Sequence, residues 1–122
     1  MFDITSGEAR LLLDIALMAT GRNRFKSAET ILAALDEFRP GSDQLAVARM
    51  ILAISKGDLQ GAVDFADGRR FAGQPVSPMV EAFKGMALLR LERTVEAMKT
   101  IEEVAAQTED PVAARLAKDM MT

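Results

Sequence analysis

The sequence contains no cysteine, histidine, tryptophan or tyrosine, and only 5% of its 122 residues are aromatic. Without cysteine there are no disulfide bonds and no thiolate chemistry, which agrees with a reducing cytoplasm. Without histidine or cysteine the chain also lacks the usual proton shuttle and the usual ligands of a metal centre. The glycines mark turns and form no phosphate-binding pattern. We therefore expect neither enzymatic activity nor a cofactor, whether nucleotide or metal.

A basic surface and a long apolar run are missing as well. The net charge of −3 argues against nucleic-acid binding, which a basic stripe would indicate. The N-terminal segment MFDITSGEA carries acidic residues where a signal peptide would carry basic ones. The most apolar segment, LLLDIALMA at 11–19, is far shorter than the about 20 apolar residues that cross a bilayer. We expect a cytoplasmic protein without a membrane segment.

The residues that are present favour helices. Apolar residues make up 49% of the chain, enough for the core of one domain. Ala, Leu, Met, Glu, Lys and Arg dominate, and the alternating Val, Ile and Thr runs typical of strands are missing. Start and stop signals predict seven helices: from a Thr5–Glu8 capping box to near Gly21, about 24–38, Ser42 or Asp43 to Gly57, Asp58 to near Gly68, one opening at Ser77-Pro78, about 94–107, and one opening at Asp110-Pro111.

A repeat underlies this pattern. Ala28, Ala62 and Ala97 recur at spacings of 34 and 35 residues, and Pro40, Pro75 and Pro111 at 35 and 36. This is the period of the tetratricopeptide repeat, a helix–turn–helix unit that stacks into a solenoid. We predict an all-α, tetratricopeptide-like solenoid of helical hairpins in a single domain, 1–122. It comprises three repeats, about 9–42, 43–77 and 78–110, and a capping helix at 111–121 that turns Val112, Leu116 and Met120 to one side.

In such a stack the first helix of each pair lines a concave groove. Four positions of each of these helices point into it, and nine of the resulting twelve residues are apolar. A trough of Leu, Ile, Val and Met suits an amphipathic helix, and methionine adapts to different contours. The predicted groove residues for a partner are Leu13, Leu17, Val47, Ile51, Ile54, Met79, Met86 and Leu89; the remaining positions are Arg10, Thr20, Gln44 and Ala82.

The sequence leaves two questions open: what covers the groove side chains, and what the segment at 68–73 does. The groove side chains could instead be the core of a compact bundle, with the last helix filling the trough, because periodicity shows two apolar faces but not what covers them. The segment GRRFAG at 68–73 offers arginine and phenylalanine, which are typical interface anchors. Alternatively, its arginines complement the negative pole of a helix end and Phe71 is tucked under the loop.

Three stretches carry a resemblance to a known family. Leu11–Leu35 resembles the opening of the tetratricopeptide-like chaperones of bacterial type III secretion needle subunits, in a pattern whose matching residues are Leu12, Leu13, Asp14, Ile15, Ala16, Leu17, Thr20, Gly21 and Ala28. The segments SKGDLQGA, at 55–62, and TEDPVAARLAKDM are similar to the family's Gly-Asp turn into the fourth helix and its Asp-Pro start of the last helix. Between Ala66 and Pro78 there is little similarity.

The resemblance implies a chaperone that keeps the needle subunit monomeric in the bacterial cytoplasm. In that family the subunit's amphipathic C-terminal helix lies in the concave groove, and a small helical co-chaperone supports the protein near its N-terminal helices. Neither a nucleotide nor a metal is implied. Three other interpretations stay open. The chain is an adaptor for an extended peptide or its C-terminal carboxylate, another tetratricopeptide-like secretion component, or a structural protein that buries the trough against its own copy. An adaptor of that type lines its groove with polar side chains, and at the groove positions of this sequence only Arg10 and Gln44 offer polar contacts.

Overall fold

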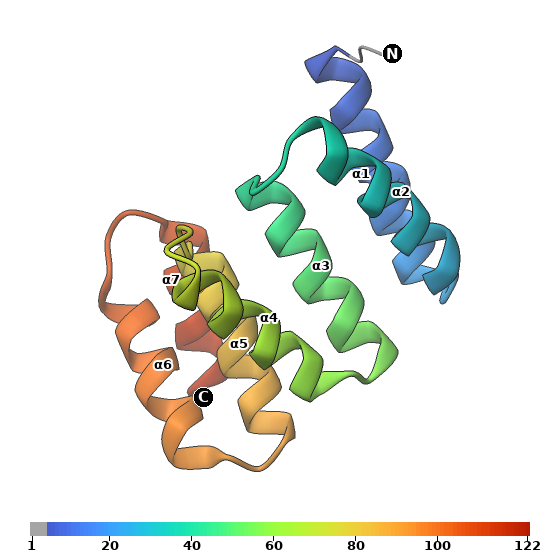
Figure 1. The fold of residues 1–122 in the computed structure, drawn as a ribbon. Coiled ribbons are helices and arrows are strands. Elements are labelled where there is room, and N and C mark those ends of the chain that lie inside the picture. The colour runs from blue at the N-terminus through green and yellow to red at the C-terminus, as the bar shows by residue number, and fades with distance from the viewer. Residues whose placement is uncertain (1–4) are drawn as a thin grey trace. The chain divides into compact units, whose positions relative to one another are not determined.

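The structure, a computed structural model, describes residues 5–122. Within this range the protein is all-α, as predicted, with seven helices and no strand (Figure 1). The helices are α1 (Ser6–Gly21), α2 (Phe25–Phe38), α3 (Asp43–Lys56), α4 (Leu59–Phe71), α5 (Pro78–Arg90), α6 (Thr94–Ala106) and α7 (Pro111–Met120). The first four residues of the N-terminal segment considered above lie outside the described residues. No helix in the described range has the length and apolar character needed to span a membrane.

The residue contacts divide the chain into two compact units. The N-terminal unit, Met1–Gly57, contains α1, α2 and α3, and each of these helices contacts the other two. Its core is aliphatic and combines alanines, which let the helices approach closely, with leucines that fill the space between them. The core cluster consists of Ala9, Ala16, Ala28, Leu32, Leu35, Leu45, Ala48 and Leu52.

The C-terminal unit, Asp58–Thr122, contains α4 to α7. Helix α5 contacts α4, α6 and α7, and α6 also contacts α7. Leu88 of α5 and Ile101 of α6 are among its largest fully buried side chains. Gly85 faces Ile101, and a Cβ atom added at Gly85 would lie 2.7 Å from Ile101 Cγ1. The missing side chain at Gly85 therefore sets how closely α5 and α6 pack.

Side-chain caps start four of the helices where the sequence predicts them. Thr5 Oγ1 accepts a hydrogen bond from the Glu8 N–H, and Glu8 Oε1 accepts one from the Thr5 N–H, both at 3.1 Å. The side chains of Asp58, Ser77 and Asp110 each accept a hydrogen bond from the backbone N–H three residues later and so cap α4, α5 and α7. These bonds satisfy backbone donors that have no partner inside the helix. The predicted end of the fourth helix near Gly68 is wrong, because α4 continues to Phe71.

The turns that follow α1, α3 and α5 share one backbone feature. Asn23, Gly57 and Glu92 have φ values of 60°, 84° and 62°, in the left-handed region that commonly ends a helix. They are 34 and 35 residues apart, which is the spacing of the repeat alanines. After α1 and α5 the same hydrogen bond follows: Arg24 N–H donates to the Ala19 carbonyl at 2.8 Å, and Arg93 N–H donates to the Leu88 carbonyl at 3.0 Å. The turn geometry thus repeats with the sequence, while the tetratricopeptide order of packing stays a prediction.

Two ion pairs join α4 to α5. Arg70 pairs with Glu81, and Lys84 Nζ lies 2.7 Å from Asp67 Oδ1. In a tetratricopeptide repeat, bulky apolar residues would be expected at 81 and 84. Both side chains are instead largely covered, with 16% and 14% of their surface exposed. Glu81 and Lys84 are therefore covered although they are charged, because each pairs with an oppositely charged residue of α4.

The last helix packs differently from the expectation. Its buried residues are Ala113, Ala114 and Ala117, and it contacts both α5 and α6. Val112, predicted on the covered side with Leu116 and Met120, is 68% exposed. Leu116 and Met120 are half-buried, so the three alanines, which permit a close helix–helix approach, form the most deeply buried part of the contact.

The capping box gives a direct stability prediction. Replacing Thr5 by alanine removes the oxygen that accepts from the Glu8 N–H, and we expect the free energy of unfolding to fall by about 1 kcal/mol. Urea denaturation followed by circular dichroism measures it. The matched control is Thr30→Ala in α2, where the hydroxyl only donates to the Lys26 carbonyl within the helix. A loss at Thr30 as large as that at Thr5 would contradict the capping role.

Candidate helix-binding face and its pocket

Four of the predicted groove residues form two rows on neighbouring helices of the N-terminal unit. Leu13 and Leu17 lie on α1, and Val47 and Ile51 lie on α3, at matching spacings of four residues. All four are half-buried. Leu13 and Leu17 pack partly against the aliphatic core cluster. Each of these side chains therefore keeps part of its apolar surface open.

The other predicted groove residues have different settings. Ile54 is only 8% exposed; it follows the fully buried Met50 by one turn on the same side of α3, so its assignment to an open groove is wrong. Thr20 is also buried, and its hydroxyl donates to the Ala16 carbonyl at 2.9 Å. The α5 members lie in the C-terminal unit and are half-buried, namely Met79, Met86 and Leu89. A single trough along α1, α3 and α5 stays a prediction.

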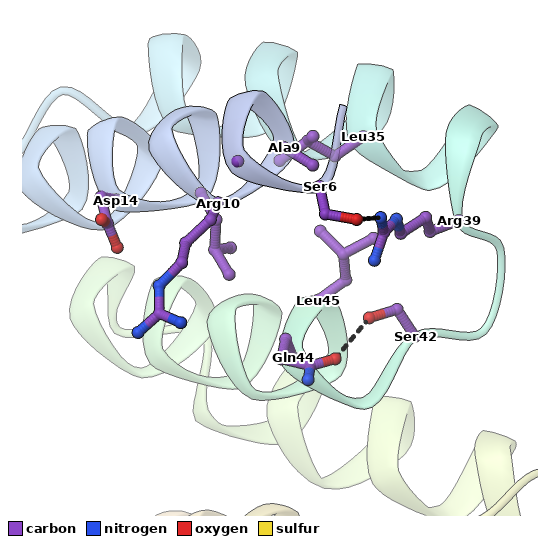
Figure 2. Close-up of a pocket in the computed structure, with 11 residues that line it drawn as sticks. Ser6, Ala9, Arg10, Asp14, Leu35, Arg39, Ser42, Gln44 and Leu45 are labelled. Atoms are coloured by element: carbon purple, nitrogen blue, oxygen red, sulfur yellow. Dashed lines mark hydrogen bonds between the residues drawn. The ribbon is translucent and has the colours of Figure 1, made fainter. Parts of the chain in front are cut away.

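A pocket of about 630 Å³ opens beside the first of these leucines (Figure 2). Its apolar lining comes from all three helices of the N-terminal unit, and its polar lining comes from α1, the end of α2 and the start of α3. The lining residues are Ser6, Gly7, Ala9, Arg10, Leu13, Asp14, Leu35, Arg39, Ser42, Gln44 and Leu45. Leu13 belongs both to the pocket and to the leucine row, so the two features are continuous.

The polar groups of the pocket lie around its aliphatic wall. Arg39 Nη2 donates to Ser6 Oγ at 2.7 Å, and Ser42 Oγ donates to Gln44 Oε1 at 2.9 Å. Figure 2 shows Arg10 and Arg39 on opposite sides of the pocket, with Leu45 between them. Arg10 and Arg39 are both exposed to solvent. A ligand in the pocket would therefore meet apolar surface in the middle and guanidinium groups at its flanks.

The pocket lining also shows how the row on α1 and the row on α3 are aligned with each other. Ser6 and Gly7 begin α1, Ser42 and Gln44 lie where α3 begins, and all four line the pocket. The two helices begin at the same end of the N-terminal unit and run in the same general direction (Figure 1). Each carries one polar residue followed by two apolar ones at i, i+3 and i+7, which is the spacing of one helix face. We call this surface the α1–α3 face: Arg10, Leu13, Leu17, Gln44, Val47 and Ile51.

Helix α1 also has an exposed apolar stripe that the sequence analysis did not single out. Leu11, Ile15 and Met18 are 60%, 41% and 59% exposed. Their spacing of four and three residues places them together, about opposite the buried Ala9, Ala16 and Thr20. We call them the outer stripe. The signal was present in the segment LLLDIALMA, whose apolar residues occupy both sides of one helix.

The GRRFAG segment matches neither of its two interpretations fully. Arg69 is buried, and its Nε and Nη2 donate to the Pro75 carbonyl at 3.2 and 2.9 Å, which holds the loop after α4. Arg70 pairs with Glu81. Phe71 is 95% exposed, so the expectation that it is tucked under the loop is wrong. A single exposed aromatic residue is ordinary on protein surfaces, and the arginines here have structural contacts.

The chemistry that these surfaces offer is that of binding. The α1–α3 face presents aliphatic side chains next to guanidinium, amide and hydroxyl groups, the composition that an amphipathic helix meets in a groove. Arg39 escaped sequence reasoning because it follows α2 and reaches the pocket only through the fold. No known protein family matches the chain, and no curated protein matches it either.

Proposed function

We propose that this chain is a chaperone of the bacterial type III secretion needle subunit and that the α1–α3 face binds the subunit's amphipathic C-terminal helix. The observation that carries the proposal is the half-buried state of Leu13, Leu17, Val47 and Ile51 on two helices that run side by side. Such open aliphatic rows suit the apolar face of a third helix. The resemblance of Leu11–Leu35 to this chaperone family supplies the identity of that helix.

The mechanism needs only burial of apolar surface. A needle subunit polymerises through its own apolar face, so a chaperone that covers this face keeps the subunit monomeric. Each Å² of apolar surface removed from water contributes about 25 cal/mol before the costs of association. Met79, Met86 and Leu89 of α5, half-buried in the C-terminal unit, offer apolar side chains of the same kind in that unit. The chaperone acts in the bacterial cytoplasm without a cofactor.

The outer stripe is the proposed site of the small helical co-chaperone. Leu11, Ile15 and Met18 lie on α1, and 60%, 41% and 59% of their surface is exposed to solvent. Their i, i+4, i+7 spacing matches the ridge that one helix presents to another. Two partners would then occupy two sides of the same helix, with the subunit on the α1–α3 face and the co-chaperone on the outer stripe.

The distribution of polar groups favours this function over a generic adaptor for extended peptides. An extended peptide needs hydrogen-bonding partners along its whole backbone. On the α1–α3 face, Arg10 and Gln44 gather at one pocket, and the four residues beyond them are aliphatic. A helix satisfies its own backbone groups and can therefore lie on such a surface.

The test is the polymerisation of the purified needle subunit of the same organism, followed by light scattering. With an equimolar amount of this chain and its co-chaperone we expect the subunit to stay monomeric and to elute with them from a size-exclusion column. A subunit with aspartates on the apolar face of its C-terminal helix is the control and should elute alone. Polymerisation at the same rate with and without the chain would refute the proposed function.

A further inference from the structure

The pocket at the start of the α1–α3 face has a charge pattern that the aliphatic rows lack. Of its charged lining residues, Arg10 and Arg39 are cationic and Asp14 is anionic. Arg10 makes no hydrogen bond or ion pair with any of residues 5–122, and Asp14, one turn away, makes none either. Among the described residues, the Arg39 guanidinium bonds only to the neutral hydroxyl of Ser6. The two guanidinium groups are therefore available to an anion.

The pocket combines these two cationic groups with an apolar lining. Leu13, Leu35 and Leu45 provide aliphatic surface, and Leu45 lies between the two arginines (Figure 2). A small inorganic anion would leave that surface uncovered, whereas a carboxylate next to a large apolar side chain would use both. The end of a peptide helix has this chemistry when its last turn carries an apolar residue and a carboxylate.

We propose that the pocket binds a carboxylate at the C-terminal end of the bound helix and thereby sets the direction in which that helix lies on the α1–α3 face. The inference rests on the proposed function. A helix carries partial negative charge at its C-terminal end, so that end is the one attracted to Arg10 and Arg39. The bound helix then runs antiparallel to α1 and α3, with its earlier turns over Leu17 and Ile51. The carboxylate belongs either to the chain terminus or to an acidic side chain in the last turn.

The probe is a fluorescein-labelled synthetic amphipathic peptide with leucines at i, i+3, i+4 and i+7 and a polar face of lysine and glutamine. Four versions are compared by anisotropy: a free C-terminal acid, a C-terminal amide, the amide with one glutamate in its last turn, and the amide with that glutamate in its first turn. We expect the free acid and the last-turn glutamate peptide to bind about tenfold more tightly than the plain amide. The first-turn glutamate should bring no such gain.

The variant Arg10→Gln/Arg39→Gln should reduce the tenfold difference to less than about twofold, because it weakens binding of the two carboxylate peptides far more than binding of the amide. The matched control is Arg22→Gln/Arg24→Gln, which removes the same charge from exposed residues at the α1–α2 turn, outside the pocket lining. It should keep the full preference. A gain from only one of the two carboxylate peptides identifies the source of the carboxylate and supports the proposal.

Two results overturn the inference while the proposed function stands: equal affinity of wild-type protein for the acid, amide and last-turn glutamate peptides, or a preference that survives in the double variant. A gain from the first-turn glutamate alone also overturns it, because the helix would then lie in the opposite direction. If none of the peptides binds, the proposed function and the inference both fail.

Discussion

Replacing Leu17 by aspartate is expected to abolish binding of the needle-subunit helix while the helical content stays that of the wild type. Leu17 lies on the α1–α3 face at the end away from the pocket and is half-buried. In the complex its replacement would place an unpaired carboxylate against the apolar face of the bound helix, at a cost of about 3 kcal/mol. That corresponds to about a hundredfold increase in Kd. Anisotropy of a labelled peptide of the subunit's C-terminal helix measures it.

A second variant separates loss of binding from loss of folding. Leu17 packs partly against the core cluster of the N-terminal unit, whereas Ile51 is not among the residues that pack there. Ile51→Asp should therefore weaken binding by a similar factor with less effect on stability. If both variants lose their circular dichroism signal, the two side chains act as core and the face is not a binding site. Normal binding by a folded variant would equally contradict the assignment.

The matched control is Met18→Asp, which introduces the same charge at the next residue of the same helix. Met18 belongs to the outer stripe and is 59% exposed, on the side of α1 away from the α1–α3 face. We expect Met18→Asp to bind the subunit peptide like the wild type and to lose the co-chaperone in a pull-down. The Leu17 variant should show the reverse pattern.

A leucine at Gly85 is expected to lower the free energy of unfolding by about 3 kcal/mol or more. Glycine inside a helix costs about 1 kcal/mol relative to alanine, so its place in the middle of α5 needs a compensating contact. That contact is with Ile101, which is fully buried and whose Cγ1 would lie 2.7 Å from a Cβ at this position. Because Ile101 is buried where α5 packs against α6, the two helices must move apart to make room for a leucine side chain.

The control for this effect is Gly68→Leu in α4. A Cβ at Gly68 meets no atom within 4 Å, so the substitution should raise stability by up to about 1 kcal/mol through helix propensity. Urea midpoints followed by circular dichroism compare the two variants. An unchanged midpoint for Gly85→Leu would mean that the contact between α5 and α6 is looser than described here.

The helix starts could be predicted because their signals are local. Thr5 with Glu8, Asp58, Ser77 and Asp110 each bond to a backbone group three residues away, and such pairs are visible in any window of sequence. The end of α4 could not be found in the same way. Gly68 was expected to stop the helix, but a glycine stops a helix by adopting a left-handed conformation.

The left-handed residue after α4 is Gly73, with φ of 75°. The Gln74 N–H donates to the Arg69 carbonyl at 2.9 Å, which closes the last turn there. Two glycines five residues apart were equivalent as stop signals in the sequence. The buried Arg69 side chain, which donates to the Pro75 carbonyl, is a contact with the loop that composition does not indicate.

The candidate face was predictable only in part, for a similar reason. The helical period correctly grouped Leu13 with Leu17 and Val47 with Ile51. The period does not indicate which apolar side is covered, so it predicts Ile54 in the groove although this side chain is buried, and it does not identify the outer stripe as exposed. Arg39 enters the pocket from the end of α2, and a contact of this kind depends on how three helices pack together.

The left-handed residues Asn23, Gly57 and Glu92 have a consequence for how a chain of this kind can change in length. They sit in connections of two or three residues, at 22–24, 57–58 and 91–93. After α1 and α5 the flanking hydrogen bonds span a fixed number of residues, so an inserted residue would break them. The connections at 39–42, 72–77 and 107–110 are longer, at four to six residues. Evolutionary insertions and deletions should therefore be more frequent in these longer connections than in the short turns after α1, α3 and α5.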